Sequence, residues 1–247
     1  MEYIFETKQN GYEDFASGRV LYNARGTTAF PVRLASEIMQ RCFRHLEGKG
    51  NDEPYAVYDP CCGGAYMLTV VGLLHGHRMK RVVASDVNPE VLGIAEKNLS
   101  LLSADGMSRR KKELAYLLGQ YNKPSHREAL ESVEKLAPLL TRSNIEETCS
   151  FHHDVTATAA ADLPVQAGVI DIVLTDLPYG EIVHWQSECG NPLSRFFDNM
   201  YARLEPERSV MAVIADKRQK LRHDKFRRLE AFKVGKRQVA IFEPISG

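Results

Sequence analysis

The sequence has no excess of either charge, no cysteine framework and no long apolar run. Its 32 Lys and Arg balance 32 Asp and Glu, so global charge does not direct the chain toward nucleic acid or a membrane. The five cysteines form an odd set without a CxxC pair, which excludes a disulfide framework and favours a cytoplasmic location. The longest apolar run, AYMLTVVGLL, is too short to span a bilayer. We expect no membrane partner, and no metal, because no His or Cys set has ligand spacing.

An alternation of apolar strand patterns with amphipathic helix patterns is what the sequence does contain. Five strands are predicted, each ending in Asp, at 55–59, 81–86, 149–154, 169–176 and 209–216, and a hairpin of two more lies within 229–245. Helices are predicted at 32–46, 66–76, 89–102 and 192–204. Such alternation predicts an α/β fold, with a mostly parallel sheet of seven strands flanked by helices. Its ligands are expected at the carboxyl ends of the strands.

Residues 104–147 interrupt this alternation. They hold two helical patterns separated by YNKPS, which supplies a helix stop and a helix start. We expect them to form an inserted helical hairpin within a single domain of residues 1–247, which begins with an N-terminal helical extension, residues 1–50.

The stretch VYDPCCGG places an acid, a proline and two glycines between a strand and a helix. Gly63 and Gly64 let the backbone approach a ligand, and the helix that follows offers free N–H groups. Asp86 ends the next strand, 23 residues after Gly63, a spacing that fits a carboxylate bound to ribose hydroxyls. GxGxxG is absent, which favours a nucleoside ligand over a dinucleotide. An ordinary tight turn between strand and helix is the alternative interpretation.

Three motifs, DPCCGGAYML, SDVNPEVLGIAEKNL and DLPYG, occur in an order that resembles the class I S-adenosylmethionine-dependent methyltransferases. The resemblance covers residues 55–245 and implies a Rossmann-like sheet and S-adenosyl-L-methionine as the cofactor. Within that superfamily, the inserted helical pair and RGTTAFPVRLASEIMQR resemble the avilamycin-resistance type of 23S rRNA guanine methyltransferase.

The resemblance implies a cofactor site built from strand-end acids and the turn after the first strand. Its implied members are Asp59, Pro60, Gly63, Gly64, Asp86 and Asp154. The first four would hold the methionine end of the cofactor, Asp86 the ribose hydroxyls and Asp154 the adenine amine. The family's second glycine of G-x-G falls at Ala65 here, so Gly64 is expected to take over part of its role.

The stretch DLPYG resembles the [DNS]-P-P-[YFW] motif of enzymes that methylate planar nitrogens, with Leu177 in place of the first proline. Asp176 would accept a hydrogen bond or a proton from the base nitrogen, and the Leu177 carbonyl would be a second acceptor. Pro178 makes the turn rigid, and Tyr179 offers a flat face to an extruded base. A plain strand-end turn with Tyr179 in the core is the alternative interpretation.

Basic residues concentrate in 217–237, which holds ten Lys or Arg and two acids. We expect this stretch to bind RNA phosphates through Lys217, Arg218, Lys220 and Arg222. Trp185, in the loop 179–192, closes over the extruded base or anchors that loop in the core, and both interpretations stay open.

The sequence therefore predicts S-adenosylmethionine-dependent N-methylation of a guanine in ribosomal RNA, most simply 23S rRNA, with N1 and N2 both open. A DNA or protein-glutamine N-methyltransferase is one alternative, because such enzymes use related turns; no separate target-recognition domain is visible in the sequence. A non-catalytic RNA-binding protein that retains the cofactor is the other, with activity lost through the departures at Ala65 and Leu177.

Overall fold

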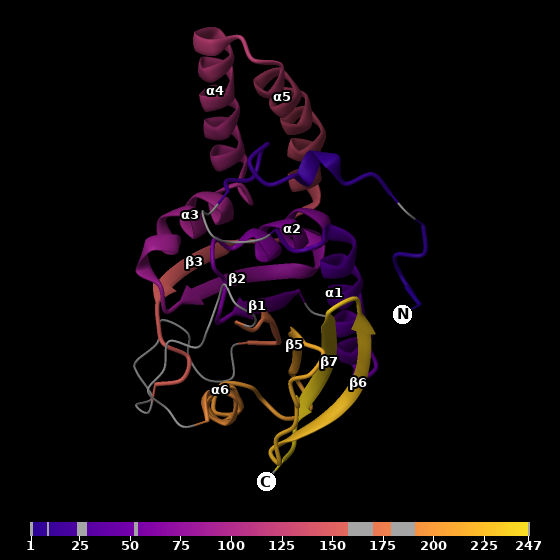
Figure 1. The fold of residues 1–247 in the computed structure, drawn as a ribbon. Helices are drawn as coiled ribbons and strands as arrows, with labels where there is room; N and C mark the ends of the chain where they lie inside the picture. The colour runs from indigo at the N-terminus through magenta and orange to yellow at the C-terminus, as the bar shows by residue number, and fades with distance from the viewer. Residues whose placement is uncertain are drawn as a thin grey trace.

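A single mixed sheet organises the fold, which a computed structural model describes for residues 2–8, 10–23, 29–51, 54–157, 170–178 and 191–246. Within these ranges the sheet has seven strands in the order β3-β2-β1-β4-β5-β7-β6 (Figure 1). They are β1 (Tyr55–Asp59), β2 (Met79–Asp86), β3 (Glu147–His152), β4 (Ile172–Asp176), β5 (Val210–Asp216), β6 (Phe226–Val234) and β7 (Arg237–Pro244). Strands β1 to β5 are parallel, whereas β7 is antiparallel to both β5 and β6. The predicted sheet with its C-terminal hairpin is confirmed.

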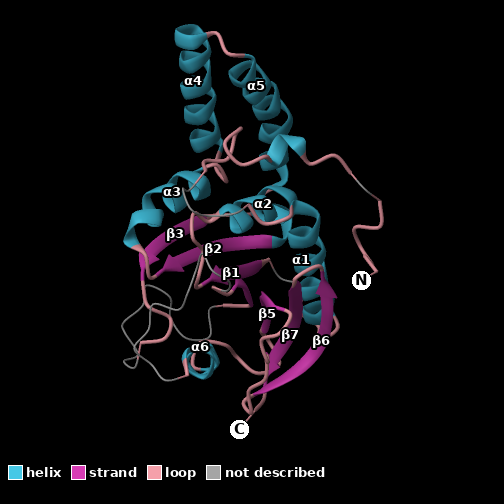
Figure 2. Ribbon diagram, in the orientation of Figure 1, coloured by secondary structure: helices cyan, strands magenta, loops and turns pink. Residues whose placement is uncertain are grey.

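Alternate residues of the central strands belong to two separate apolar cores. Val57 and Ile172 join the core under α1 (Val32–Glu47), α2 (Tyr66–His75) and α3 (Pro89–Ser100), whereas Tyr58 and Val173 join the core under α6 (Pro192–Tyr201). Figure 2 shows these helices on the two sides of the sheet. Because both faces are covered, the central strands β1, β4 and β5 are buried along nearly their whole length instead of alternating.

Pairing partners, and not local sequence, decide where several strands begin and end. Strand β3 occupies Glu147–His152, because its last residue pairs with Asp86, the last residue of β2. Asp154 therefore follows β3, and the predicted bounds 149–154 are wrong. Similarly, β6 begins at Phe226, ahead of the predicted 229, because Phe226 pairs with Pro244.

The predicted inserted helical pair is present as α4 (Ala104–Tyr121) and α5 (Pro124–Leu136), which are followed by the 3-10 helix η3 (Ala137–Arg142). The pair projects away from the sheet, beyond α2 and α3 (Figure 1). The Ser103 hydroxyl caps α4 by accepting the Gly106 N–H at 3.1 Å, and Asn122 ends the helix in a left-handed conformation. Among the described residues, no helix is long and apolar enough to cross a membrane.

The junction between α3 and α4 requires glycine at position 106. A Cβ atom there would lie 1.8 Å from the carbonyl oxygen of Ser100, so we expect Gly106→Ala to lower the free energy of unfolding by about 2–3 kcal/mol. Gly119→Ala, in the same helix, is the control: its Cβ meets nothing within 4 Å. That variant should gain up to about 1 kcal/mol from the better helix former. Urea denaturation checks both, and equal stabilities would contradict the close approach at Gly106.

Candidate active site

Three of the five predicted strand-end acids lie together at the carboxyl edge of the sheet. Strands β1 and β4 are neighbours there, and the strand order reverses between them, which is where open α/β sheets bind ligands. Asp59 ends β1, Asp86 ends β2 and Asp176 ends β4. Both Asp86 and Asp176 act electrostatically on Asp59. The thiol of Cys61, after β1, is under the influence of Asp59, Asp86 and Asp154 together.

Asp59 is buried, and its pKa is higher than is usual for an aspartate. It is 2% exposed, and desolvation is the main reason that its pKa rises to about 7. The negative charges of Asp86 and Asp176 raise the pKa further, whereas the Thr175 hydroxyl and the Cys61 N–H, 3.0 Å from Oδ1, oppose the rise. A cationic ligand group beside Asp59 would therefore favour its ionised form.

The turn after β1 is left-handed at Gly63, with φ of 52°, and at Ala65, with φ of 55°. Ala65 is buried, and its N–H donates to the Cys62 carbonyl at 2.8 Å. Ala65 itself adopts the left-handed conformation that glycine favours, and the part that Gly64 takes at the cofactor stays a prediction. Such a conformation costs a residue with a Cβ atom about 1–2 kcal/mol.

Asp86 links this turn to the end of β2. Its Oδ2 accepts the N–H of Gly63 at 2.8 Å, and its Oδ1 accepts the N–H of Asn88 at 2.9 Å. Each carboxylate oxygen can accept a second hydrogen bond, so these contacts orient the carboxylate and leave it able to bind ribose hydroxyls. Nearby, the Ser85 hydroxyl donates to the carbonyl of Pro60 at 3.5 Å.

Asn98 is a site residue that sequence reasoning missed. It is fully buried on α3, and its Nδ2 donates to the carbonyl of Gly64 at 2.8 Å and to that of Tyr22 at 3.0 Å. Its Oδ1 accepts the Tyr22 N–H at 2.7 Å. A single Asn within an amphipathic helix pattern gives no signal for this role, which joins α3, the N-terminal segment and the glycine turn.

Asp154 lies in the loop after β3, where its Oδ1 accepts both the N–H of Thr156 at 2.8 Å and the hydroxyl of Thr156 at 2.6 Å. These bonds hold the Asp154 carboxylate against its own loop. It remains a candidate for the adenine contact, on the same edge as Asp86.

The DLPYG turn begins with Asp176, whose side chain is 27% exposed and whose Oδ2 lies 3.9 Å from Nε of Arg237. Leu177 is buried, and its N–H donates to the carbonyl of Ile214 in β5 at 2.9 Å. This bond explains the departure from the family motif, because a proline at position 177 has no N–H to donate. Pro178 follows, half-buried, whereas Tyr179 and Trp185 lie outside the described residues.

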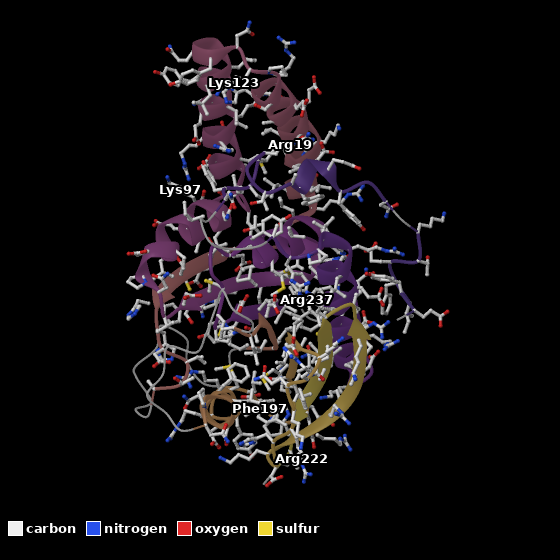
Figure 3. The ribbon with its side chains drawn as sticks, viewed as in Figure 1. Arg19, Lys97, Lys123, Phe197, Arg222 and Arg237 are labelled. Atoms are coloured by element: carbon white, nitrogen blue, oxygen red, sulfur yellow. The ribbon has the colours of Figure 1, made fainter. Side chains whose placement is uncertain are left out.

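The basic stretch 217–237 divides into two parts. Its predicted RNA contacts are all exposed in the loop between β5 and β6, and they are Lys217, Arg218, Lys220 and Arg222. Further along, Lys225 pairs with Asp198 at 2.7 Å, and Arg227 pairs with Glu243. Figure 3 shows Arg222 and Arg237 toward opposite ends of the β6–β7 hairpin. Ion pairs occur in both parts, because Arg218 in the loop also pairs with Asp216 at 2.9 Å.

The cysteines of the turn are not built as nucleophiles. Burial is the main cause that raises the pKa of Cys61 and of Cys62 well above the usual value, so both thiols stay protonated and unreactive. Over the part of the chain that the structure describes, no group of three or more His, Cys, Asp and Glu could hold a metal ion.

Comparison with known proteins assigns the chain to a protein family. The sequence matches the profile of one protein family over residues 1–237, and that family is described as rRNA methyltransferase AviRa. The chain belongs to the AviRa rRNA methyltransferase family. Family membership confirms the resemblance found in the sequence, and it makes the protein a methyltransferase with the class I fold.

Relatives of the AviRa family are similar over nearly the whole chain. A 23S rRNA (guanine(2535)-N(1))-methyltransferase from Streptomyces viridochromogenes is 39% identical over 230 residues, which cover 92% of this chain and 90% of the relative. A solved structure of rRNA methyltransferase AviRa from the same organism has a TM-score of 0.85 and 36% identity, covering 98% of this chain and 96% of that chain. A second structure of that protein has a TM-score of 0.80 at 36% identity and the same coverage.

Proposed function

We propose that this AviRa-family protein transfers a methyl group from S-adenosyl-L-methionine to N1 of a guanine in 23S rRNA. The observation that carries the proposal is the 39% identity, over 92% of the chain, to a relative named for that reaction. The geometry supports it, because Asp176 ends β4 beside the reversal of strand order, where open α/β sheets bind ligands. A carboxylate at that place can accept the proton that N1 of guanine loses.

The residues of the carboxyl edge fit the cofactor. Buried Asp59 would hold the cationic amine of its methionine end, with the backbone of Pro60, Gly63 and Gly64 around it. Asp86 would bind the ribose hydroxyls, and Asp154 would accept from the adenine amine. The fit rests on the raised pKa of Asp59 and on the left-handed turn that Asp86 holds at Gly63. When bound, S-adenosylmethionine supplies an electrophilic methyl group on a positively charged sulfur.

The DLPYG turn would supply the catalytic groups of the protein. Asp176 would accept the N1 proton of guanine as that nitrogen is methylated, and the Leu177 carbonyl would accept a second N–H of the base. Pro178 and the bond from the Leu177 N–H to Ile214 hold the turn rigid, which keeps both acceptors oriented. Tyr179 stays the predicted stacking partner of the extruded base, and Trp185 either closes over that base or anchors its loop in the core.

We propose that the exposed loop between β5 and β6 binds RNA phosphates. Lys217 and Arg218 follow directly on Asp216 at the carboxyl edge, and Lys220 and Arg222 continue along the loop. Their contribution should depend on salt, because phosphate contacts release counterions.

S-adenosylmethionine is expected to bind more tightly as the pH rises from 5 to 7. Asp59 has a pKa raised to about 7, mainly by burial, so at lower pH it must lose a proton before it can pair with a cationic amine. The Kd should fall by up to about tenfold per pH unit below the pKa and then level off. Isothermal titration calorimetry measures this. Asp59→Asn should bind more weakly with a flat profile, and a flat profile in the unaltered protein would remove Asp59 from the amine contact.

The reaction is tested by transfer of labelled methyl to naked 23S rRNA, the assembled large subunit, 16S rRNA, duplex DNA and ribosomal proteins, side by side. We expect label in 23S rRNA, in either form, and 1-methylguanosine after digestion to nucleosides. N2-methylguanosine would overturn the assigned atom, and label only in DNA or protein would overturn the substrate. Cofactor binding without transfer to any of these would favour an RNA-binding protein without catalytic activity.

A further inference from the structure

Arg237 lies beside the proposed base although it is distant in sequence. It is the first residue of β7, and its antiparallel pairing with Asp216, the last residue of β5, brings it to the carboxyl edge of the sheet. Its Nε lies 3.9 Å from Oδ2 of Asp176, and the two side chains are 26% and 27% exposed. The cationic side chain of Arg237 therefore lies next to Asp176, the proposed base, and both side chains are exposed enough for a substrate to reach them.

The guanidinium is held on a second side by an aromatic ring. Its central carbon lies 5.4 Å from the ring centroid of Phe30, which is 5% exposed and stands just ahead of α1. By contrast, the side chains of Arg218 and Arg222 are 84% and 86% exposed. The Phe30 ring and the pairing of β7 with β5 restrict the position of the Arg237 side chain. A side chain that contacts one defined atom of a substrate has to be held in this way. Figure 3 shows Arg237 close to the start of β7.

The reaction proposed above creates charge that Asp176 cannot stabilise. When the N1 proton of guanine leaves, negative charge is shared between N1 and O6, because the N1 lone pair is conjugated with the C6 carbonyl. Asp176 becomes neutral when it accepts this proton, so it offers no positive charge to stabilise the charge on O6. An arginine whose sole role was to pair with Asp176 would lower the basicity of that carboxylate and would oppose the proton transfer. The planar guanidinium has five N–H donors, enough to serve a carboxylate and a carbonyl oxygen together.

We propose that Arg237 is a catalytic residue that donates hydrogen bonds to guanine O6 while Asp176 accepts the N1 proton. The inference rests on the proposed N1 methylation. In that step the N–H electron pair stays on N1 and forms the new bond to the methyl carbon, and the methyl–sulfur pair leaves with the sulfur. Arg237 also favours guanine over adenine, because the adenine C6 amine is a donor and does not accept from a guanidinium.

The test measures single-turnover methylation of 23S rRNA by Arg237→Gln, Asp176→Asn and the double variant. We expect Arg237→Gln to lower the rate about 100-fold, as the loss of a charge-stabilising donor does, with the Kd of S-adenosylmethionine changed less than about threefold. In the Asp176→Asn background, Arg237→Gln should lower the residual rate again, by at least about tenfold, because Arg237 contacts the base directly. Arg208→Gln is the control, since Arg208 is 66% exposed and precedes the opposite end of β5.

Two results would overturn the inference. An unchanged rate in Arg237→Gln would remove Arg237 from the reaction. A loss that vanishes in the Asp176→Asn background would make Arg237 a positioning residue that acts only through Asp176. Both differ from failure of the proposed function, in which the unaltered protein itself forms no 1-methylguanosine in 23S rRNA.

Discussion

We expect Asp176→Asn to lower the rate of guanine methylation by roughly 1000-fold while RNA and cofactor stay bound. Loss of a positioned general base costs about 10² to 10⁴ in rate, and Asp176 is the acid that ends β4 at the reversal of strand order. Asn keeps the size of the side chain and removes its ability to take a proton. The measurement combines single-turnover transfer of labelled methyl with filter binding of 23S rRNA and calorimetry of S-adenosylmethionine.

Asp105→Asn is the matched control for this variant. Asp105 is an exposed acid in the first turn of α4, so the same chemical change there should leave the rate within about twofold. If Asp176→Asn kept most of its activity, the proton would have to leave by another route. If it lost cofactor binding as well, Asp176 would belong to the cofactor site instead.

We expect Asp86→Ala to raise the Kd of S-adenosylmethionine by about 100-fold or more and to leave RNA binding nearly unchanged. Hydrogen bonds to a charged group contribute about 1.5–3 kcal/mol each, and two ribose hydroxyls would lose theirs. Asp86 also holds the turn after β1 by accepting the N–H groups of Gly63 and Asn88. The variant therefore removes a ligand contact and loosens the backbone around the same ligand.

Calorimetry of the cofactor and filter binding of 23S rRNA, done on one preparation, check the Asp86 prediction. Glu90→Gln is the control, because Glu90 is the next acid along the chain and its side chain is exposed in the first turn of α3. A result in which RNA affinity fell and cofactor affinity held would assign Asp86 to the substrate side of the site.

The strand-end acids show how much of the candidate site could be predicted from the sequence. A buried parallel strand is a short apolar run, and the acid that ends it stands at the carboxyl edge whatever its neighbours are. Asp59, Asp86 and Asp176 could therefore be placed on one edge from their local patterns alone, and the structure has each of them at the end of its strand. The motif order added the cofactor and the reaction, which the match to the AviRa family supports.

Two departures from the motifs of class I methyltransferases became interpretable only from the three-dimensional structure. Ala65 replaces a glycine and still adopts φ of 55°, so the turn keeps its shape at a cost in strain. Leu177 replaces a proline and uses the N–H that a proline lacks to bond to Ile214 in β5. Neither observation requires lost activity, which the sequence had left open as an alternative.

By itself the sequence determined the α/β alternation, the inserted helical pair, the glycine turn and the acids at the strand ends, because each depends on residues close together in the chain. The tertiary structure decided the end of β3, the contact of Asn98 with the glycine turn and the approach of Arg237 to Asp176. Those features depend on which strands pair and which helix covers which face, so their residues meet across 34 positions in the case of Asn98 and Gly64. Local propensity carries no information about such partners, and the pairing of β7 with β5 is what places a cation beside the proposed base.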